Sequence, residues 1–172
     1  MNFKKLASVL SKKKILILRT DGNGVQWAGD DVSMYELSGM PKFTTDTLLF
    51  CFGVNMSKKD SWLMEEADFP EEFDTSPELT SDLPIVIDEN MIIISGSTYA
   101  LLHTADCCFI LPERYTIPIM TEQTHLFLRT MPITGEAKII AREGMFVTAI
   151  FQPVNATEEI TKWLEKTANA VR

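Results

Sequence analysis

The sequence predicts an α+β fold with a mostly antiparallel sheet of about eight or nine strands and an amphipathic helix at each terminus. Helical spacing of apolar residues occurs at the two ends of the chain, and short β-branched and aromatic runs between turn residues fill the middle. Because these runs follow one another without intervening helices, they favour antiparallel pairing over a βαβ fold. The chain has 172 residues, 45% of them hydrophobic, and we expect residues 1–172 to form a single domain.

The N-terminal helix is predicted over residues 2–13. Phe3, Leu6 and Leu10 recur at the spacing of one helix face, together with Ala7. Lysines occupy the opposite face, so this helix is amphipathic.

The C-terminal helix is predicted over residues 156–170. Asn155 precedes it as an N-cap and Glu158 follows three residues later, which is the arrangement of a capping box. Its apolar stripe consists of Ile160, Trp163, Leu164, Ala168 and Val171. We expect this stripe to be buried against the sheet.

Two hairpins are predicted around glycine-containing turns. Residues 14–20 pair with residues 25–29 across residues 21–24, where either glycine can supply a positive φ. Residues 137–151 fold around a two-residue loop of Glu143 and Gly144. In that second hairpin the expected register places the following residues on one face: Ile139, Ala141, Phe146 and Ile150.

The remaining strands are predicted from short apolar runs. Those in the middle of the chain form an antiparallel meander over residues 85–87, 91–94, 98–103 and 107–111. Two further strand candidates are residues 47–54 and 125–130. Around His103 two readings remain open: residues 99–111 form one continuous strand, or Thr104 and Ala105 form a hairpin loop that pairs His103 with Asp106. In the continuous strand His103 has apolar neighbours, and we expect a neutral imidazole near pH 7.

The charge distribution is polarised along the chain. Formal net charge is −8, and residues 60–89 contain eleven acids and no Lys or Arg. The first twenty residues contain six Lys and Arg and no acid. This excess of acid disfavours direct binding to a nucleic-acid backbone.

The acidic region 60–89 is predicted to be a loop or short-helix region, with a short helix over residues 60–67. Three interpretations are open: a solvated surface, a contact with the basic N-terminal helix of the same chain, or a docking surface for a basic partner protein. The docking hypothesis rests on apolar residues among the acids, which can act as anchors. Its candidate partner-binding residues are Glu65, Glu66, Phe69, Glu71, Glu72 and Phe73.

Catalytic and metal-binding patterns are weak in this sequence. His103, Asp106 and Cys107 are the candidates for a nucleophilic site, since a Cys with a His base supports acyl transfer. Adjacent cysteines in an apolar strand are more often packing residues. The two histidines and three cysteines do not show the spacing of a metal site, and we expect neither a metal nor a cofactor.

A ligand-binding candidate consists of Trp27, Asp30 and Asp31, with Tyr35 nearby. An aromatic ring beside paired carboxylates can hold a polar ligand, and paired carboxylates raise one another's pKa. The competing interpretation is a strand Trp that packs on the core, followed by an acidic turn.

The sequence favours a non-enzymatic, cytoplasmic protein-interaction module whose acidic segment docks on a basic partner. The odd number of cysteines suits a reducing compartment, and the absence of a long apolar run predicts no contact with the membrane. The alternatives are a small enzyme or ligand-binding domain with a pocket near His103, and an acidic nucleic-acid mimic. Oligomeric state is not predicted.

Overall fold

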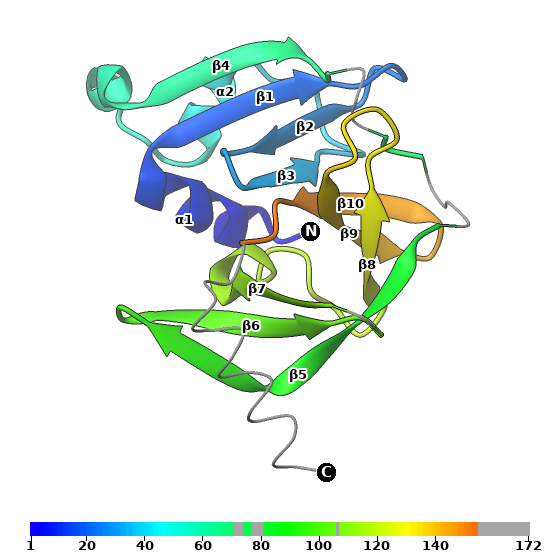
Figure 1. Ribbon diagram of the computed structural model, residues 1–172. Coiled ribbons are helices and arrows are strands. Elements are labelled where there is room, and N and C mark those ends of the chain that lie inside the picture. The colour runs from blue at the N-terminus through cyan, green and yellow to red at the C-terminus, as the bar shows by residue number, and fades with distance from the viewer. Residues whose placement is uncertain (71–73, 77–80, 106, 155–172) are drawn as a thin grey trace.

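The computed structural model describes residues 1–70, 74–76, 81–105 and 107–154. Within these residues ten strands form one sheet in the order β4-β1-β2-β3-β10-β9-β8-β5-β6-β7 (Figure 1). All neighbouring strands are antiparallel except β1 and β4. The strands are β1 (Ile15–Thr20), β2 (Gln26–Gly29), β3 (Ser33–Glu36), β4 (Leu63–Asp68), β5 (Leu83–Ile94), β6 (Ser97–His103), β7 (Cys108–Pro112), β8 (Thr124–Thr130), β9 (Ala137–Glu143) and β10 (Phe146–Phe151). The α+β class with a mostly antiparallel sheet is confirmed, with ten strands in place of the roughly eight or nine expected.

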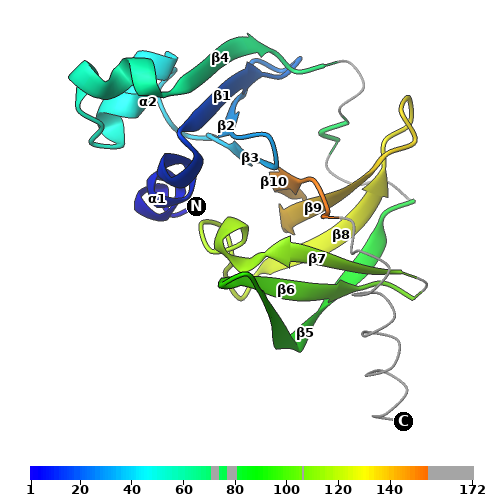
Figure 2. The same cartoon turned by 60° about the vertical axis from the view of Figure 1, so that its left-hand side comes forward.

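The sheet is strongly curved. Strands β4, β1, β2 and β3 form one end, strands β5, β6 and β7 form the other, and β8 to β10 join them (Figures 1 and 2). The helices are α1 (Phe3–Lys13), α2 (Thr45–Cys51) and the 3-10 turns η1 (Met56–Ser61) and η2 (Glu113–Tyr115). Helix α1 lies between the two ends of the sheet, on its concave side.

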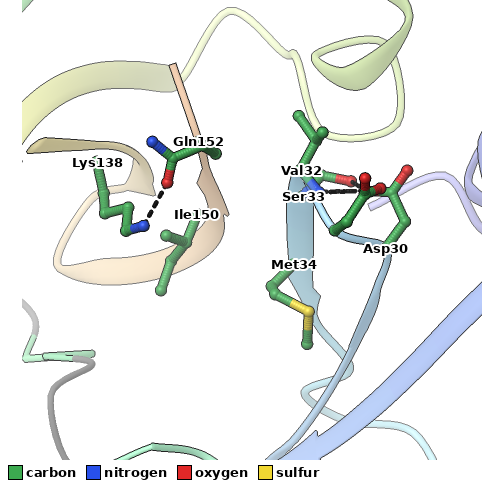
Figure 3. Close-up of a pocket in the computed structure, with 8 residues that line it drawn as sticks. Asp30, Val32, Ser33, Met34, Lys138, Ile150 and Gln152 are labelled. Carbon is green, nitrogen blue, oxygen red and sulfur yellow. Dashed lines mark hydrogen bonds between the residues drawn. The ribbon is translucent and has the colours of Figure 1, made fainter. Parts of the chain in front are cut away.

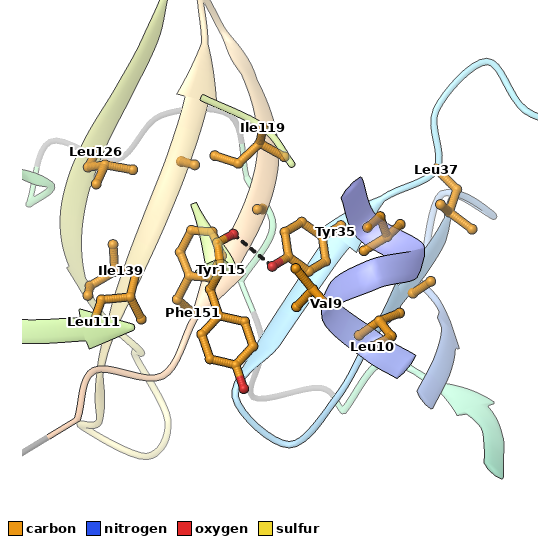
Figure 4. Close-up of a cluster of buried hydrophobic side chains, with 14 of the residues drawn as sticks. Val9, Leu10, Tyr35, Leu37, Leu111, Tyr115, Ile119, Leu126, Ile139 and Phe151 are labelled. Atoms are coloured by element: carbon orange, nitrogen blue, oxygen red, sulfur yellow. Dashed lines mark hydrogen bonds between the residues drawn. The ribbon is translucent and has the colours of Figure 1, made fainter. Parts of the chain in front are cut away.

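The main hydrophobic core fills this concave side. Side chains from α1, α2, η2 and most of the strands contribute to one buried cluster (Figure 4). Leu16 of β1 and Leu102 of β6 belong to it although they lie at opposite ends of the sheet, and both are completely buried. We call the concave side the inner face and the other side the outer face.

Helix α1 confirms the prediction for the N-terminus. The side chain of Asn2 caps it by accepting a hydrogen bond from the backbone N–H of Lys5 at 3.0 Å. Leu6 and Leu10 are completely buried in the core. The predicted C-terminal helix at residues 156–170 lies outside the described residues, and so does its expected burial.

The first predicted hairpin is confirmed, whereas the register of the second is shifted. Strands β1 and β2 pair with Thr20 opposite Gln26, and Gly24 supplies the positive φ. In the second hairpin Glu143 lies opposite Phe146, so the loop is Gly144 and Met145. Gly144 has φ of 60° and occupies the first loop position, where such a turn favours glycine.

That shift has a large effect on which side chains are buried. Moving the loop by one residue shifts the pairing by two, so Phe146 stays on the face of Ile139 but lies opposite Glu143 at the end of the hairpin. Phe146, expected in the core, is therefore 72% exposed. The bulge between Val147 and Ala149 adds one further residue and moves Ile150 to the outer face, opposite Ile140.

Two predicted elements are of the wrong type. Residues 47–54 were expected as a strand but are mostly helix α2. Thr44 and Thr47 form a reciprocal capping box there, and this local signal outweighs the β-branched composition. Of the short helix expected over residues 60–67, residues 60 and 61 end the 3-10 turn η1, and residues 63–67 belong to strand β4, which pairs in parallel with β1.

The middle of the chain forms longer strands than expected. Strand β5 is continuous through residues 88–90, with an irregular register between Ile87 and Met91. A continuous strand over residues 99–111 is excluded, since β6 and β7 form a hairpin. Strand β8 confirms the prediction for residues 125–130, and β3 was not predicted.

Candidate functional site

The acidic strand β4 forms one edge of the sheet. The only described strand beside it is β1, which it joins through hydrogen bonds from the N–H of Leu63 to Lys14 O and from the N–H of Phe69 to Thr20 O. Backbone groups alternate in direction along a strand. The N–H and C=O groups of Met64, Glu66 and Asp68 therefore point away from β1, toward the open edge.

Two of the predicted docking acids hold the fold together locally. Glu65 forms an ion pair with Arg19 at 2.6 Å on the outer face. Glu66 accepts a hydrogen bond from the backbone N–H of Thr45, the first residue of α2. A carboxylate at this position satisfies a free N–H of the helix and complements its dipole. Both side chains remain exposed at the edge.

The linking segment, residues 69–82, connects β4 to β5, and its described residues contact the outer face. Phe69 packs edge-on against Trp27 with ring centroids 5.3 Å apart. This contact gives Phe69 a packing role within the chain. The other predicted docking residues of this segment, Glu71, Glu72 and Phe73, lie outside the described residues.

Arg129 of β8 binds the linking segment at its far end. Its guanidinium donates to both carboxylate oxygens of Asp82 at 2.7 and 2.8 Å and to the carbonyls of Asp74 and Ser76, both at 2.9 Å. Arg129 is completely buried, and the side chain of Asp82 is 2% exposed. Glu65 and Asp82 thus pair with arginines of the sheet, and among the described residues no ion pair joins the acidic segment to helix α1.

Asp30 is part of a buried polar network at the turn between β2 and β3. Its Oδ1 accepts hydrogen bonds from the N–H of Val32 and from the N–H and hydroxyl of Ser33, each at 2.9 Å. Its Oδ2 accepts from the hydroxyl of Tyr115 at 3.0 Å. Lys13 lies 3.6 Å from the same oxygen. The carboxylate therefore has partners on both oxygens and orders this turn.

Lys13 and Tyr35 extend this network into the core. Burial opposes the charge of Lys13, but its contacts with Asp31, Tyr115 and Asp30 outweigh burial and raise its pKa above the ordinary value. The Tyr35 hydroxyl donates to the carbonyl of Tyr115 at 2.7 Å (Figure 4), and burial raises the pKa of Tyr35. The network ties α1, β3 and η2 together.

A shallow pocket lies beside Asp30 on the outer face (Figure 3). Trp27, predicted to share a site with the two aspartates, does not line it; it is buried in the cluster that also contains the lining residues Met34 and Ile150. The lining residues are Asp30, Asp31, Val32, Ser33, Met34, Lys138, Ile150 and Gln152. Lys138 donates to Gln152 and to Glu136, and Asp31 accepts from Lys13. Since these charged groups already have partners in the chain, the pocket is best explained as part of the fold.

The histidine and cysteine candidates are arranged differently from both predictions. His103 lies directly opposite Cys108, and the loop of residues 104–107 separates them. The Nε2 of His103 is 3.3 Å from Asp88 Oδ2, so the imidazole has an acidic neighbour instead of the apolar surroundings expected for a continuous strand. Asp106 lies outside the described residues. Cys107 is exposed in the loop.

The surroundings of Cys108 do not favour a catalytic role for its thiol. Burial, followed by the nearby Asp88 and Cys107, raises the pKa of the Cys108 thiol. A nucleophilic cysteine needs the opposite shift, because the thiolate is the reactive form. Among the described residues no group of three or more His, Cys, Asp or Glu side chains is placed to hold a metal ion.

The sequence patterns did not point to Arg129 or Tyr115. In the alternating pattern of a half-buried strand, Arg129 between Leu128 and Thr130 occupies a position expected to face solvent. Residues 60–89 contain the signal that could have predicted a role for Arg129. They include eleven acids and no Lys or Arg, so any buried acid among them needs a cationic partner from another part of the chain.

Comparison with known proteins gives no match to a family model, a curated protein or a solved structure. Within the described part of the chain, none of the helices has the length and apolar character needed to span a membrane.

Proposed function

We propose that the protein is a non-enzymatic interaction module that binds a basic, extended segment of another protein along the edge of β4. The observation that carries this proposal is the position of β4 at the end of the sheet, with no described strand beyond it. A peptide that adds to a sheet edge forms main-chain hydrogen bonds along its length. The backbone N–H and C=O groups that would bond to the peptide belong to Met64, Glu66 and Asp68.

The charge of β4 favours a basic partner. Glu65, Glu66 and Asp68 are exposed at this edge, so a peptide with Lys or Arg would meet opposite charge on both faces of the strand. The same carboxylates disfavour pairing between two copies of β4, because identical acids would be brought together.

An exposed apolar side chain at the start of β4 supports the choice of this edge as the binding site. Leu63 is 67% exposed beside Glu65 on the outer face. A large apolar side chain among charges can act as an anchor when a partner covers it. Leu63 therefore takes the anchoring role that the sequence suggested for Phe69.

The proposed location is the cytoplasm. Cys51, Cys107 and Cys108 are free thiols, and thiols persist in a reducing compartment. The alternatives of an enzyme and of a nucleic-acid mimic receive less support, because the Cys108 thiol pKa is raised and several described acids pair within the chain.

Peptide binding tests the proposal. The probes are synthetic ten-residue peptides that alternate Lys with Val, and matched peptides that alternate Glu with Val. We expect the Lys peptide to perturb the NMR signals of residues 63–68 and to bind more weakly as salt is added, because exposed charges are screened over about 8 to 10 Å. Equal binding of the Glu peptide would contradict the proposal.

A pair of variants at Asp68 separates backbone pairing from charge. Asp68→Pro removes the edge N–H together with the charge, whereas Asp68→Asn removes the charge alone. Proline is tolerated at an edge position whose N–H faces solvent. We expect Asp68→Pro to weaken Lys-peptide binding by about tenfold beyond Asp68→Asn. If the two variants bind equally, the peptide does not add to β4.

A further inference from the structure

The part of strand β5 next to its hairpin with β6 has one open side. Strand β8 pairs with residues 83–85 of β5, whereas β6 pairs with residues 86–87 and 91–94. Past Ile85, β5 bends away from β8 and continues to the hairpin (Figure 1). Among the described strands none pairs with the other side of residues 91–94, and we call this side the β5 edge.

A tight turn determines which backbone groups of β5 bond to β6. Its two loop residues, Ser95 and Gly96, have positive φ values of 49° and 76°. In a two-residue hairpin loop the flanking residues form a hydrogen-bonded pair, here Ile94 with Ser97. Bonded and non-bonded pairs alternate along an antiparallel ladder, so Ile92 also bonds to β6 and the residues on either side of it do not.

Met91 and Ile93 therefore present their backbone N–H and C=O groups to the β5 edge. Their side chains lie on the face of Ala100 and are 55% and 74% exposed. Residues 91–94 contain no charge and no proline, which are common means of protecting an open edge from pairing. The β5 edge thus combines outward main-chain groups with exposed apolar side chains.

The two outermost strands of the sheet are better protected against pairing with a copy of themselves. Strand β4 carries exposed acids, which would be brought together in such a pair. In β7 the outward carbonyl of Ile110 already accepts the N–H of Val154, and Pro112 has no N–H to offer. Of these three edges, the β5 edge is the one best suited to pairing with an identical strand.

Residues 91–93 are complementary to themselves in an antiparallel register centred on Ile92. Met91 of one copy then lies opposite Ile93 of the second copy, and the two exchange a pair of main-chain hydrogen bonds. A two-fold axis repeats each contact, so the register gives four such bonds. Apolar side chains meet on both faces of the joined strands, with Ile92 beside its own copy on the outer face.

The same register keeps the acids of β5 apart. Asp88 and Glu89 precede the β5 edge in the sequence, and they would lie toward the loop of Ser95 and Gly96 in the second copy. Pairing through this edge therefore does not place like charges opposite each other, unlike pairing between two β4 strands.

We propose that two copies of this chain associate through the β5 edge in this two-fold antiparallel register, so that the sheet continues from one copy into the other. The partner is a second copy because the register is self-complementary and the uncharged strand offers no charge for a basic or acidic peptide to recognise. A contact this short belongs to the weak interfaces, so dimers should form at micromolar concentrations or above. This inference is independent of the function proposed for β4.

Introduced cysteines test the register. Ile92 would lie opposite its own copy at a non-bonded pair, where Cα atoms are about 4.5 Å apart and within reach of a disulfide. Ile94→Cys is the matched control, because Ile94 is also half-buried on the outer face but would lie more than about 13 Å from its copy. Both variants are made with Cys51, Cys107 and Cys108 replaced by Ser, and diamide is the oxidant. We expect about tenfold more covalent dimer from Ile92→Cys than from Ile94→Cys.

Sedimentation equilibrium measures the association without a cross-link, from about 5 μM to about 1 mM protein. We expect the mass of the wild type to rise with concentration toward that of a dimer. Ile93→Lys puts a charge at the β5 edge, and Ile133→Lys is the matched control, because Ile133 is 69% exposed between β8 and β9. Ile93→Lys should weaken association by about tenfold or more, and Ile133→Lys should leave it within about twofold.

Three results would overturn the proposal. They are a monomer over the whole concentration range, equal effects of the two lysine variants, and equal cross-linking of the two cysteine variants. Both lysines replace exposed side chains, so neither should change stability by more than about 0.5 kcal/mol, and urea unfolding checks this. Loss of association in a fully folded Ile93→Lys variant is the result that supports pairing through the β5 edge.

Discussion

At the level of single residues, the hydroxyl of Tyr35 connects β3 to η2 through the core. The ring is completely buried and its O–H donates to the carbonyl of Tyr115. Because burial raises its pKa, the hydroxyl keeps its proton and remains a donor throughout the pH range in which the protein is studied. Tyr35→Phe should therefore lower the free energy of unfolding by about 1 to 3 kcal/mol, the cost of a buried carbonyl without a donor.

Urea unfolding measures this effect. Tyr99→Phe is the control, because Tyr99 of β6 is half-buried on the outer face and no hydrogen bond of its hydroxyl is found among the described residues. The control should change stability by less than about 0.5 kcal/mol. Equal effects of the two substitutions would show that the Tyr35 hydrogen bond adds no stability.

Cys108 provides the residue-level test of the enzyme alternative. Burial and the nearby Asp88 and Cys107 raise its thiol pKa, so at pH 7 the thiolate fraction is smaller than in an ordinary cysteine. In a Cys51→Ser, Cys107→Ser background we expect the rate of alkylation by iodoacetamide to rise with pH and to level off above the ordinary pKa of about 8.5. An inflection below that value would indicate an activated thiol next to His103 and would revive a catalytic role.

At the level of elements, the link between β4 and β5 depends on one buried ion pair. Arg129 is completely buried and donates four hydrogen bonds to Asp74, Ser76 and Asp82. Arg129→Met would remove the two hydrogen bonds that the guanidinium donates to the carboxylate of Asp82 and would leave Arg142, 3.6 Å away, as its cationic neighbour. We expect a loss of about 3 to 5 kcal/mol in the free energy of unfolding.

Arg19→Met is the matched control for this ion pair. Arg19 also pairs with an acid, Glu65, but the Glu65 side chain is 53% exposed. Exposed pairs contribute less than about 1 kcal/mol. If thermal or urea unfolding shows similar losses for the two variants, burial does not distinguish the two ion pairs.

At the level of the whole molecule, the two edges of the sheet differ. The edge formed by β4 carries exposed acids and has no described strand beside it. Strand β7 at the other edge is bridged by Val154, which packs with Leu101 and Ile110 on the outer face. The two edges therefore differ in charge and in how far the described residues cover them.

Several features of this protein were determined by the sequence alone, and they are local ones. The cap and apolar face of α1, the hairpin between β1 and β2, and strand β8 each depend on residues within about one or two turns or on simple alternation. The α+β class also follows from the order of such segments. Where local signals competed, at Thr44 and at Gly144, the prediction gave the wrong element or a hairpin loop misplaced by one residue.

Only the tertiary structure decided the sheet order and the roles of the candidate site residues. Tyr35 and Tyr115 are 80 positions apart, Arg129 and Asp82 are 47 apart, and Thr45 and Glu66 are 21 apart. Composition does not indicate which distant groups will meet, because that depends on how the curved sheet brings its strands together. The acids of residues 60–89 illustrate this: in the sequence they form one charged segment, whereas in the fold Glu65, Glu66 and Asp82 each have a different partner. For Asp82 the physical reason is that burial makes an unpaired charge costly, whereas the partners of the exposed Glu65 and Glu66 follow from the pairing of β4 with β1 and from the position of α2.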